Sequence, residues 1–450
     1  MKTIVLGAGV IGVATAYYLS ERGCDVTVIE REPGVALGTS FGNAGVIAPA
    51  WITPWAAPGM PLRLLKCLLK PGSPLIFRPT LDPAQWRWLA SWLHECDVAR
   101  FRVNKQRMQR IAYYSRDCLR AFHATHGFDY GRSQGHLQLF RTDHDVELAQ
   151  PALALLRDAG IAYREADADE CARIEPGLRW ARVKPVAGVY LPDDEAGDCA
   201  RFTRELRAVC EGNGVSFLFD TEAVGVDVER GQVRGVRVRE LPRRRNRRSP
   251  KEALPAPPRP PDGAPASRRQ APPRVLAADA VVIALGVESA ALVEPFGVRL
   301  PLYPVKGYSA TLPVIDEQKA PRAALTDESL KTAITRFDSQ VRVAGTAEFG
   351  NRFATLREQA LQTLMKVLDD WFPHAATASS AQFWVGRRPM LPDGAPLLGP
   401  SGVDGLWLNV GHGSTGWAMA MGSGRAVADL VTRRAPEIDL DGLTLARYRL

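Results

Sequence analysis

The sequence of 450 residues contains no apolar run of about 18 residues or more, which excludes a helix that spans a membrane. Its seven cysteines show no C-x-x-C pair and no regular spacing, so they indicate reduced thiols of a cytosolic protein rather than a disulfide-bonded secreted scaffold. The seven histidines form no H-x-H or H-x-x-x-H cluster, and we predict no metal site. With 46% apolar and 24% charged residues, the composition excludes a collagenous, coiled-coil or wholly disordered chain.

Outside a single segment the sequence has almost no net charge. The formal net charge is +8, but residues 240–275 alone carry +7, together with ten prolines and almost no periodicity. Such a composition predicts a disordered insertion, and its flanks at 233–238 and 275–277 favour two arms of one hairpin. A nucleic-acid-binding protein that uses this segment is one hypothesis. A solvated loop is the default reading of the charge, and no nucleic-acid partner is expected.

Strand and helix signals alternate along the chain, whose length suggests two to three domains. Asp82-Pro83 has the pattern of a helix N-cap with proline at the first helical position. Strands are predicted at 2–6, 25–30, 135–141, 215–219, 233–238, 279–286 and 406–410, and helices at 13–23, 82–123, 200–211, 356–371 and 417–433.

A glycine-rich turn at 7–12 (GAGVIG) lies between the first strand and the first helix. Gly7 permits the tight turn, Gly9 lets the backbone approach a pyrophosphate, and Gly12 lets helix and strand pack closely. The second strand ends at Glu30, whose carboxylate can bond ribose hydroxyls and would repel a ribose 2′-phosphate. The pattern predicts a dinucleotide on the helix N-terminus, without separating NAD from FAD.

Later segments resemble the D-amino acid oxidase superfamily of FAD-dependent oxidoreductases. Residues 39–45 (TSFGNAG) resemble its second flavin-contacting loop, and residues 279–286 its second flavin-side strand. Residues 386–399 (GRRPMLPDGAPLLG) resemble its C-terminal G-x-R-P signature, and residues 409–416 the loop that closes over the isoalloxazine. A closer similarity, to the small-subunit-type D-amino acid dehydrogenases of bacteria, is carried by residues 40–59, 104–119, 135–142 and 331–337.

This resemblance implies a mixed α/β fold, α+β in part. A Rossmann-like FAD-binding domain would be assembled from separate pieces, with an antiparallel-sheet substrate domain inserted between them. The FAD-binding domain is expected in residues 1–59, 191–239, 276–300 and 385–435. The substrate domain is expected in residues 60–190, which begin with a mainly helical segment, and in 301–384. Residues 240–275 are the disordered, basic Pro/Arg-rich insertion.

The resemblance also implies site residues. Arg388 would be the catalytic residue and would bind the substrate carboxylate. His412 would contact flavin or substrate, with packing inside its loop as the alternative, and Lys306 would face either flavin or solvent. FAD would be bound non-covalently, because some relatives place a linking cysteine in the C-terminal half and every cysteine here lies at or before residue 210. The expected FAD contacts are Gly7, Gly9, Val10, Ile11, Gly12, Glu30, Arg31, Ser40, Asn43, Ala44, Gly45, Val224, Gly286, Gly411, Gly413, Ser414, Thr415 and Gly416.

The implied reaction is oxidative deamination of D-amino acids such as D-alanine to 2-oxo acids and ammonia, by hydride transfer from Cα to flavin N5. Ala333 stands where glycine oxidase-like relatives carry a substrate-site tyrosine, so their specificity does not transfer. Electrons would pass to a quinone or respiratory acceptor. The alternative is a glycine-, sarcosine- or D-proline-type oxidase that uses oxygen.

The cytoplasm is the expected location. Residues 60–77 (MPLRLLKCLLKPGSPLIF) mix apolar and basic residues, a pattern that fits contact with the cytoplasmic face of the inner membrane. A helix packed at the domain interface explains the same pattern equally well.

Overall fold

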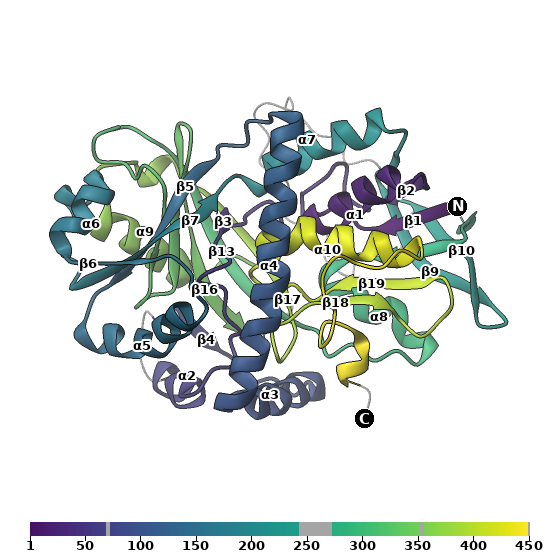
Figure 1. The fold of residues 1–450 in the computed structure, drawn as a ribbon, viewed down its shortest axis with the longest axis horizontal. Helices are drawn as coiled ribbons and strands as arrows, with labels where there is room; N and C mark the ends of the chain where they lie inside the picture. Colours follow the sequence, from purple (N-terminus) through teal and green to yellow (C-terminus); the bar gives the residue numbers. More distant parts are fainter. Residues whose placement is uncertain (69–72, 243–271, 351–354, 449–450) are drawn as a thin grey trace.

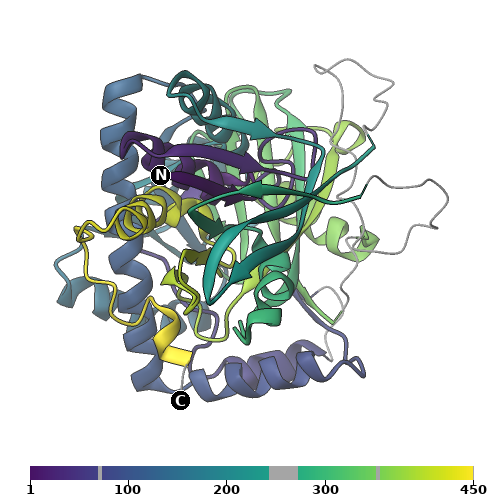
Figure 2. The same cartoon turned by 90° about the vertical axis from the view of Figure 1, so that its right-hand side faces the viewer.

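The structure is a computed structural model that describes residues 1–68, 73–242, 272–350 and 355–448. Two large β-sheets lie side by side, and helices flank both (Figure 1). The long helix α4 (Val98–His126) stands between them in this view, and after a quarter turn it lies along one side of the molecule, with α3 (Pro83–Glu95) along the base (Figure 2). The predicted mixed α/β fold is confirmed.

The six-stranded sheet is parallel except at one edge. Its strand order is β18-β19-β12-β1-β2-β8, and β18 runs antiparallel to β19. Apolar runs such as TIVL in β1 and AVVI in β12 are buried throughout, as expected for parallel strands covered on both faces. The strands come from distant parts of the chain: β1 (Lys2–Leu6), β2 (Asp25–Ile29), β8 (Ser216–Leu218), β12 (Ala280–Ile283), β18 (Leu397–Pro400) and β19 (Leu406–Val410).

Helix α10 (Gly416–Val431) packs tightly against α1 (Val10–Glu21) and α4. A Cβ at Gly424 would lie 2.8 Å from the carbonyl carbon of Ala14 in α1. A Cβ at Gly422 would lie 2.8 Å from the main-chain nitrogen of Ser115 in α4. Glycine at these two positions therefore allows both neighbouring helices to touch α10. Helix α7 (Cys199–Gly212) packs against α1 as well.

The ten-stranded sheet is mostly antiparallel, in the order β17-β13-β16-β15-β14-β5-β7-β3, with β4 paired to β16 and β6 to β7. Helix α9 (Glu358–Trp371) covers one face, where Leu364 and Trp371 pack with Tyr308 and Leu312. The strands are β3 (Val46–Ile47), β4 (Leu75–Phe77), β5 (Ser133–Phe140), β6 (Arg164–Ala166), β7 (Ala187–Ala196), β13 (Tyr303–Pro313), β14 (Ala324–Asp327), β15 (Thr332–Phe337), β16 (Gln340–Phe349) and β17 (Gln382–Met390).

A third sheet holds the arms of the predicted hairpin. It contains β9 (Thr221–Glu229), β10 (Gln232–Glu240) and β11 (Arg274–Ala277), and Val236 of β10 pairs with Leu276 of β11 in antiparallel register. The hairpin is therefore confirmed. Most of the predicted insertion, residues 243–271, lies outside the described residues.

The helical stretch predicted from 82 to 123 is two helices. Asp82 caps α3 through the Ala84 N–H at 2.9 Å, as its sequence pattern indicates. The chain then breaks at Cys96, and Asp97 caps α4 by accepting from the N–H groups of Ala99 and Arg100. The single-helix prediction was wrong because a second capping aspartate starts a new helix there.

The remaining helices are α2 (Met60–Leu68), α5 (Asp143–Asp158), α6 (Ala168–Ile174) and α8 (Ser289–Val293). Within the part of the chain that the structure describes, no helix has the length and apolar character needed to cross a bilayer.

Candidate active site

Four segments predicted to contact FAD meet at one edge of the six-stranded sheet. Residues 7–12 follow β1, Glu30 and Arg31 follow β2, Gly286 follows β12, and residues 411–416 follow β19. These strands are parallel neighbours, so their carboxyl ends lie together. In sheets of this kind, dinucleotides bind in the crevice at the carboxyl ends, beside a helix N-terminus.

Gly7, Gly9 and Gly12 occur in the first turn for different structural reasons. Gly7 has a φ of +100°, and a Cβ there would lie 2.6 Å from the carbonyl oxygen of Ala284. A Cβ at Gly12 would lie 1.9 Å from the carbonyl oxygen of Gly7, whereas a Cβ at Gly9 would approach only Ser40 Oγ among the described atoms, at 3.3 Å. No side chain caps α1 at Gly9, and its first turn holds no acidic residue. The helix N-terminus that carries Val10 and Ile11 thus fits an anionic pyrophosphate.

The loop at 39–45 connects this turn to the ten-stranded sheet. The Val10 N–H donates to Ser40 Oγ at 3.1 Å, and within residues 43–45 the Gly45 N–H donates to Asn43 Oδ1 at 2.8 Å. On the sheet side, Arg342 of β16 donates to the Asn43 carbonyl oxygen at 3.0 Å. The loop therefore lies between the α1 N-terminus and the second sheet.

Glu30 is directed back toward the glycine-rich turn. Its carboxylate accepts from the N–H groups of Ala8 at 2.7 Å and Glu32 at 2.9 Å, and burial raises its pKa. A carboxylate has about four acceptor sites, so it retains capacity for ribose hydroxyls. Arg31, also predicted to contact FAD, donates to Glu288 at 3.2 Å.

Val224 and Gly286, both predicted to contact FAD, have free space beside them. Val224 is 36% exposed on β9, whose first residue, Thr221, donates its N–H to the Glu30 carbonyl oxygen at 3.0 Å. Gly286 has a φ of +60°, and a Cβ there would meet no described atom within 4 Å.

Two main-chain N–H groups of the loop after β19 form hydrogen bonds within the protein. The N–H of Gly413 donates to the Pro389 carbonyl oxygen at 3.1 Å, and that of Thr415 donates to the His412 carbonyl oxygen at 3.2 Å. These two N–H groups are thus engaged inside the protein, and the contacts of residues 411–416 with FAD stay predictions. Ser414 and Gly416 lie at the start of α10 and are the better candidates.

The His412 side chain is buried and has an internal partner. Its Nε2 lies 3.0 Å from Ser423 Oγ of α10, and burial lowers its pKa to about 3. The neutral imidazole thus ties the loop to α10. Its contact with flavin or substrate stays a prediction.

Arg388 lies across the face of the ten-stranded sheet opposite α9. It extends from β17 over Gly307 of β13, where a Cβ would lie 2.2 Å from its guanidinium carbon. Its Nη1 donates to the carbonyl oxygens of Lys306 at 3.2 Å and Thr346 at 3.0 Å, and its Nη2 donates to that of Gly345 at 3.3 Å.

The guanidinium keeps binding capacity for a carboxylate. Five N–H groups belong to a guanidinium, and three are used, which leaves Nε–H and one Nη2–H on the same side. Among the described residues no carboxylate forms an ion pair with Arg388, and the Trp55 ring centroid lies 5.7 Å from its guanidinium carbon. Burial lowers its pKa to about 10, so the charge is retained at neutral pH. The arrangement suits a bidentate bond to a small carboxylate.

The carbonyls that hold Arg388 come from an irregular part of β16. Thr346 has a φ of +49°, and the β13–β16 register shifts between Lys306 and Tyr308. Two residues on, the fully buried carboxylate of Glu348 lies 3.0 Å from Lys306 Nζ and accepts from the Tyr308 hydroxyl. Lys306 is therefore buried in an ion pair rather than exposed to solvent. Sequence reasoning missed Glu348 and Thr346, because their roles depend on pairing between strands far apart in the chain.

Arg387 points away from Arg388, as expected for consecutive residues of a strand. It forms an ion pair with Glu288, which also accepts from Arg31. The pair of arginines on one glutamate joins β17 to the edge of the FAD crevice. Glu288 was not singled out from the sequence, although it follows the predicted Gly286 turn by two residues.

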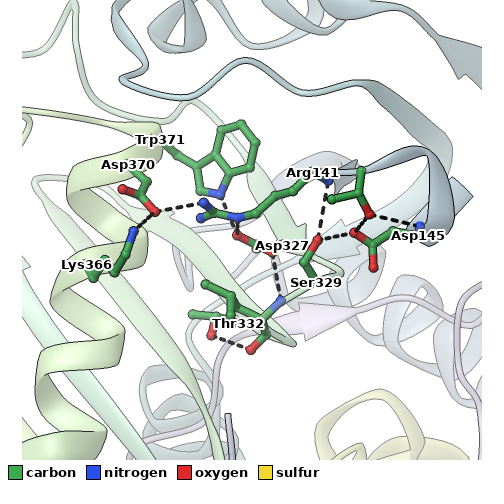
Figure 3. A network of polar contacts seen from close by, with 10 residues as sticks. Arg141, Asp145, Asp327, Ser329, Thr332, Lys366, Asp370 and Trp371 are labelled. Atoms are coloured by element: carbon green, nitrogen blue, oxygen red, sulfur yellow. Dashed lines mark hydrogen bonds and ion pairs between the residues drawn. The ribbon is translucent and has the colours of Figure 1, made fainter. Parts of the chain in front are cut away.

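A polar network fixes β14 on the α9 side (Figure 3). Arg141 donates to Asp327 at 2.6 Å and to Asp370 of α9 at 2.8 Å, and the indole of Trp371 donates to Asp327 at 2.8 Å. Lys366 pairs with Asp370 at 2.6 Å. The end of β14 is thus held to α9 and to the residue that follows β5.

Curated relatives are similar over the whole chain. The protein named D-amino acid dehydrogenase from Rhodopseudomonas palustris (strain HaA2) is 43% identical over 450 residues, covering 100% of this chain and 98% of the relative. The D-amino acid dehydrogenase from Agrobacterium fabrum is 42% identical over 449 residues and is covered in full.

Solved structures with the same fold are more distant in sequence. Glycine oxidase from Geobacillus kaustophilus has a TM-score of 0.70 at 20% identity, with 99% of this chain and 98% of that chain covered. L-proline dehydrogenase from P. horikoshii has a TM-score of 0.68 at 17% identity, with 99% and 97% covered. These similarities show the fold alone. Residues 2–430 match the model of the DAO family, described as FAD dependent oxidoreductase, and the chain belongs to this family of FAD-dependent enzymes.

Proposed function

We propose that the protein is an FAD-dependent D-amino acid dehydrogenase that converts D-amino acids such as D-alanine to 2-oxo acids and ammonia. The observation that carries the proposal is the Arg388 guanidinium, with two N–H groups on one side and no carboxylate partner among the described residues. The names of the relatives that share more than 40% identity over the full chain support the same reaction.

The crevice at the carboxyl ends of β1, β2, β12 and β19 fits non-covalently bound FAD. The N-terminus of α1, where Gly9 provides no side-chain cap, would receive the pyrophosphate, and Glu30 the ribose hydroxyls. The start of α10, with Ser414 and Gly416, would direct a positive helix end toward the flavin and stabilise negative charge there. The domain boundaries expected from the resemblance are part of this proposal.

Arg388 would hold the substrate by a bidentate bond to its carboxylate, which fixes the position and orientation of Cα. Bound FAD supplies the acceptor for the hydride that leaves Cα. The surrounding main chain holds the guanidinium in place before substrate arrives, so little rotational freedom is lost on binding. Orientation and charge stabilisation then suffice without a dedicated proton-abstracting side chain.

The visible spectrum of the purified protein tests this proposal. We expect a yellow protein whose flavin absorbance is bleached by D-alanine without oxygen and is unchanged by L-alanine. Titrations with glycine and D-proline separate the dehydrogenase from the alternative of a glycine-, sarcosine- or D-proline-type oxidase. Bleaching by glycine but not by D-alanine would contradict the proposal.

The proposed electron acceptor is a quinone or another respiratory carrier rather than oxygen. We expect turnover with a soluble quinone and slow peroxide formation under air. Rapid peroxide formation that no quinone or dye outpaces would favour the oxidase alternative.

We also propose that α2 and its surroundings contact the membrane, where a quinone acceptor is found. The helix packs Met60 and Leu64 onto the apolar cluster around Trp88, while Leu62 and Leu65 are each 59% exposed. The structure thus provides both a packed face and an exposed apolar face on one helix.

Sedimentation with anionic lipid vesicles tests the contact. The double variant Leu62→Asp/Leu65→Asp should lose most vesicle binding, whereas Leu148→Asp, at a comparably exposed position on α5, should retain it. Equal binding of both variants would refute a contact through α2.

A further inference from the structure

One face of the ten-stranded sheet is partly open in its middle. Central strands covered on both faces should be buried, yet Thr326 of β14 and its cross-strand partner Ala333 of β15 are both partly exposed. The same row continues with Ala344 of β16 and Ser309 of β13, which are buried and have small side chains. Cross-strand partners point to the same face, so these four residues form one row of small side chains, which we call the hollow.

Arg388 closes one end of this hollow. Its guanidinium donates to the carbonyl oxygens of Gly345 and Thr346, directly after Ala344 in β16. The segment between Trp51 and Trp55 spans the hollow from end to end. The Trp51 indole donates to Glu328, just beyond β14, at 2.7 Å, and the Trp55 ring lies over Arg388.

A polar chain closes the other end. Thr326 Oγ1 lies 2.9 Å from His136 Nε2, and the Gln138 amide nitrogen lies 3.2 Å from each ring nitrogen of His136. Both His136 and Gln138 are buried, and burial lowers the pKa of His136 to about 4.

The Thr326 hydroxyl is held by His136. One of its hydrogen bonds is made with the imidazole, which lies beside the Gln138 amide. A hydroxyl has one donor and two acceptor sites, so the Thr326 hydroxyl keeps hydrogen-bonding capacity toward the hollow.

We propose that Thr326, oriented by His136 and Gln138, recognises the substrate side chain, and that the hollow favours D-amino acids with a neutral, hydrogen-bonding side chain of asparagine's length. The inference rests on the proposed function, since it takes Arg388 as the carboxylate site. It adds a substrate class and three specificity-determining residues to that function.

The length follows from the strand spacing. Two strand intervals separate β16, beneath the guanidinium, from β14, which is about 10 Å. Hydrogen bonds of about 2.8 Å at each end leave roughly 4 Å between a carboxylate oxygen and the polar side-chain atom of the substrate, which requires a side chain as short as that of asparagine. D-alanine binds at Arg388 but ends over Ala344 and Ala333, short of the Thr326 hydroxyl.

The experiment compares D-asparagine with D-leucine, whose side chains are nearly equal in size but differ in the polar amide group. The kcat/KM ratio of D-asparagine to D-leucine should fall roughly 10- to 100-fold in Thr326→Val, because a lost hydrogen bond of about 1–3 kcal/mol gives a change of this order. D-alanine turnover should stay within about twofold of the wild type. Thr335→Val is the matched control: Thr335 is fully buried in β15 on the same face, and its hydroxyl has no partner among the described residues.

The outcomes distinguish the two levels of the proposal. A wild-type protein whose flavin is bleached by no D-amino acid overturns the proposed function, and this inference with it. Normal D-alanine oxidation with an unchanged ratio in Thr326→Val, or an equal change in Thr335→Val, overturns the inference alone.

A second variant covers the case in which Thr326→Val fails to retain FAD. Ala333→Leu fills the floor of the hollow and should lower kcat/KM for D-asparagine and D-leucine more than tenfold, with a smaller loss for D-alanine, whose side chain ends above this position. Equal losses for all three substrates would overturn the inference.

Discussion

Replacement of Arg388 by lysine tests the centre of the proposed site. The guanidinium bonds three main-chain carbonyl oxygens and keeps two N–H groups on one side for a carboxylate. An ammonium has three donors and no planar fork, so it cannot satisfy the carbonyls and hold both substrate oxygens together. The variant keeps the positive charge but loses the bidentate geometry.

The magnitude follows from the burial of the group. A charge-assisted contact in a site shielded from water contributes on the order of 2–4 kcal/mol, and each 1.36 kcal/mol is a factor of ten. Arg388→Lys should therefore lower kcat/KM for D-alanine by roughly 30- to 1,000-fold. Because burial brings the pKa of Arg388 down only to about 10, the wild-type KM should be steady from pH 7 to 9 and rise as the pH passes 10.

Anaerobic stopped-flow reduction of the flavin by D-alanine is the assay, with FAD content measured from the absorbance. FAD content should not change in Arg388→Lys. Arg387→Lys is the control: its ion pair with Glu288 faces the FAD crevice, so it should weaken FAD retention and leave the KM of the loaded enzyme unchanged. Loss of substrate affinity in Arg387→Lys with none in Arg388→Lys would refute the assignment of the carboxylate site.

Three further predictions address the cofactor, the insertion and the buried histidine. Gly9→Leu should yield colourless protein, because the side chain would fill the space before the α1 N-terminus, and stoichiometric FAD in this variant would refute the pyrophosphate site. Deletion of residues 243–272 should leave turnover and FAD content within about twofold, since β10 and β11 still pair, and a loss above tenfold would reveal a role for the segment. The pKa of His412 is lowered to about 3 in the fold, so acid favours the unfolded chain, in which histidine titrates near 6.5. Between pH 7 and pH 5 the free energy of unfolding should therefore fall by about 2 kcal/mol less in His412→Asn than in the wild type, as measured by urea titration.

The features predicted well are those that local sequence determines. The strand-turn-helix at 2–21, the cap at Asp82 and the hairpin arms follow from residue periodicity, glycine and capping residues within a few positions of each other. The same kind of signal at Asp97 was missed, because the apolar positions on both sides keep helical spacing and hide the break.

The features missed depend on contacts between distant strands. Nothing in the sequence around Thr346 indicates its positive φ, because the register shift there arises from pairing with β13, about 40 residues earlier. The burial of Lys306 with Glu348 and the polar chain from Gln138 to Thr326 have the same origin. A strained backbone conformation such as that of Thr346 persists where surrounding contacts stabilise it. Here the buried contacts of Glu348 stabilise the part of β16 whose carbonyl oxygens bind Arg388.

β17 joins the two halves of the proposed chemistry through the alternation of a strand. Arg387 reaches the Glu288–Arg31 pair at the FAD crevice, and Arg388 reaches the hollow where the substrate would bind. Consecutive residues of an extended strand point to opposite sides, so a shift of this strand would displace both side chains together. The pairing of Arg388 with Val305 and of Arg387 with Lys306 in β13 fixes that register. The distance between the FAD crevice and the carboxylate site is therefore set by main-chain pairing of the sheet, which is stiffer than any connection through a loop.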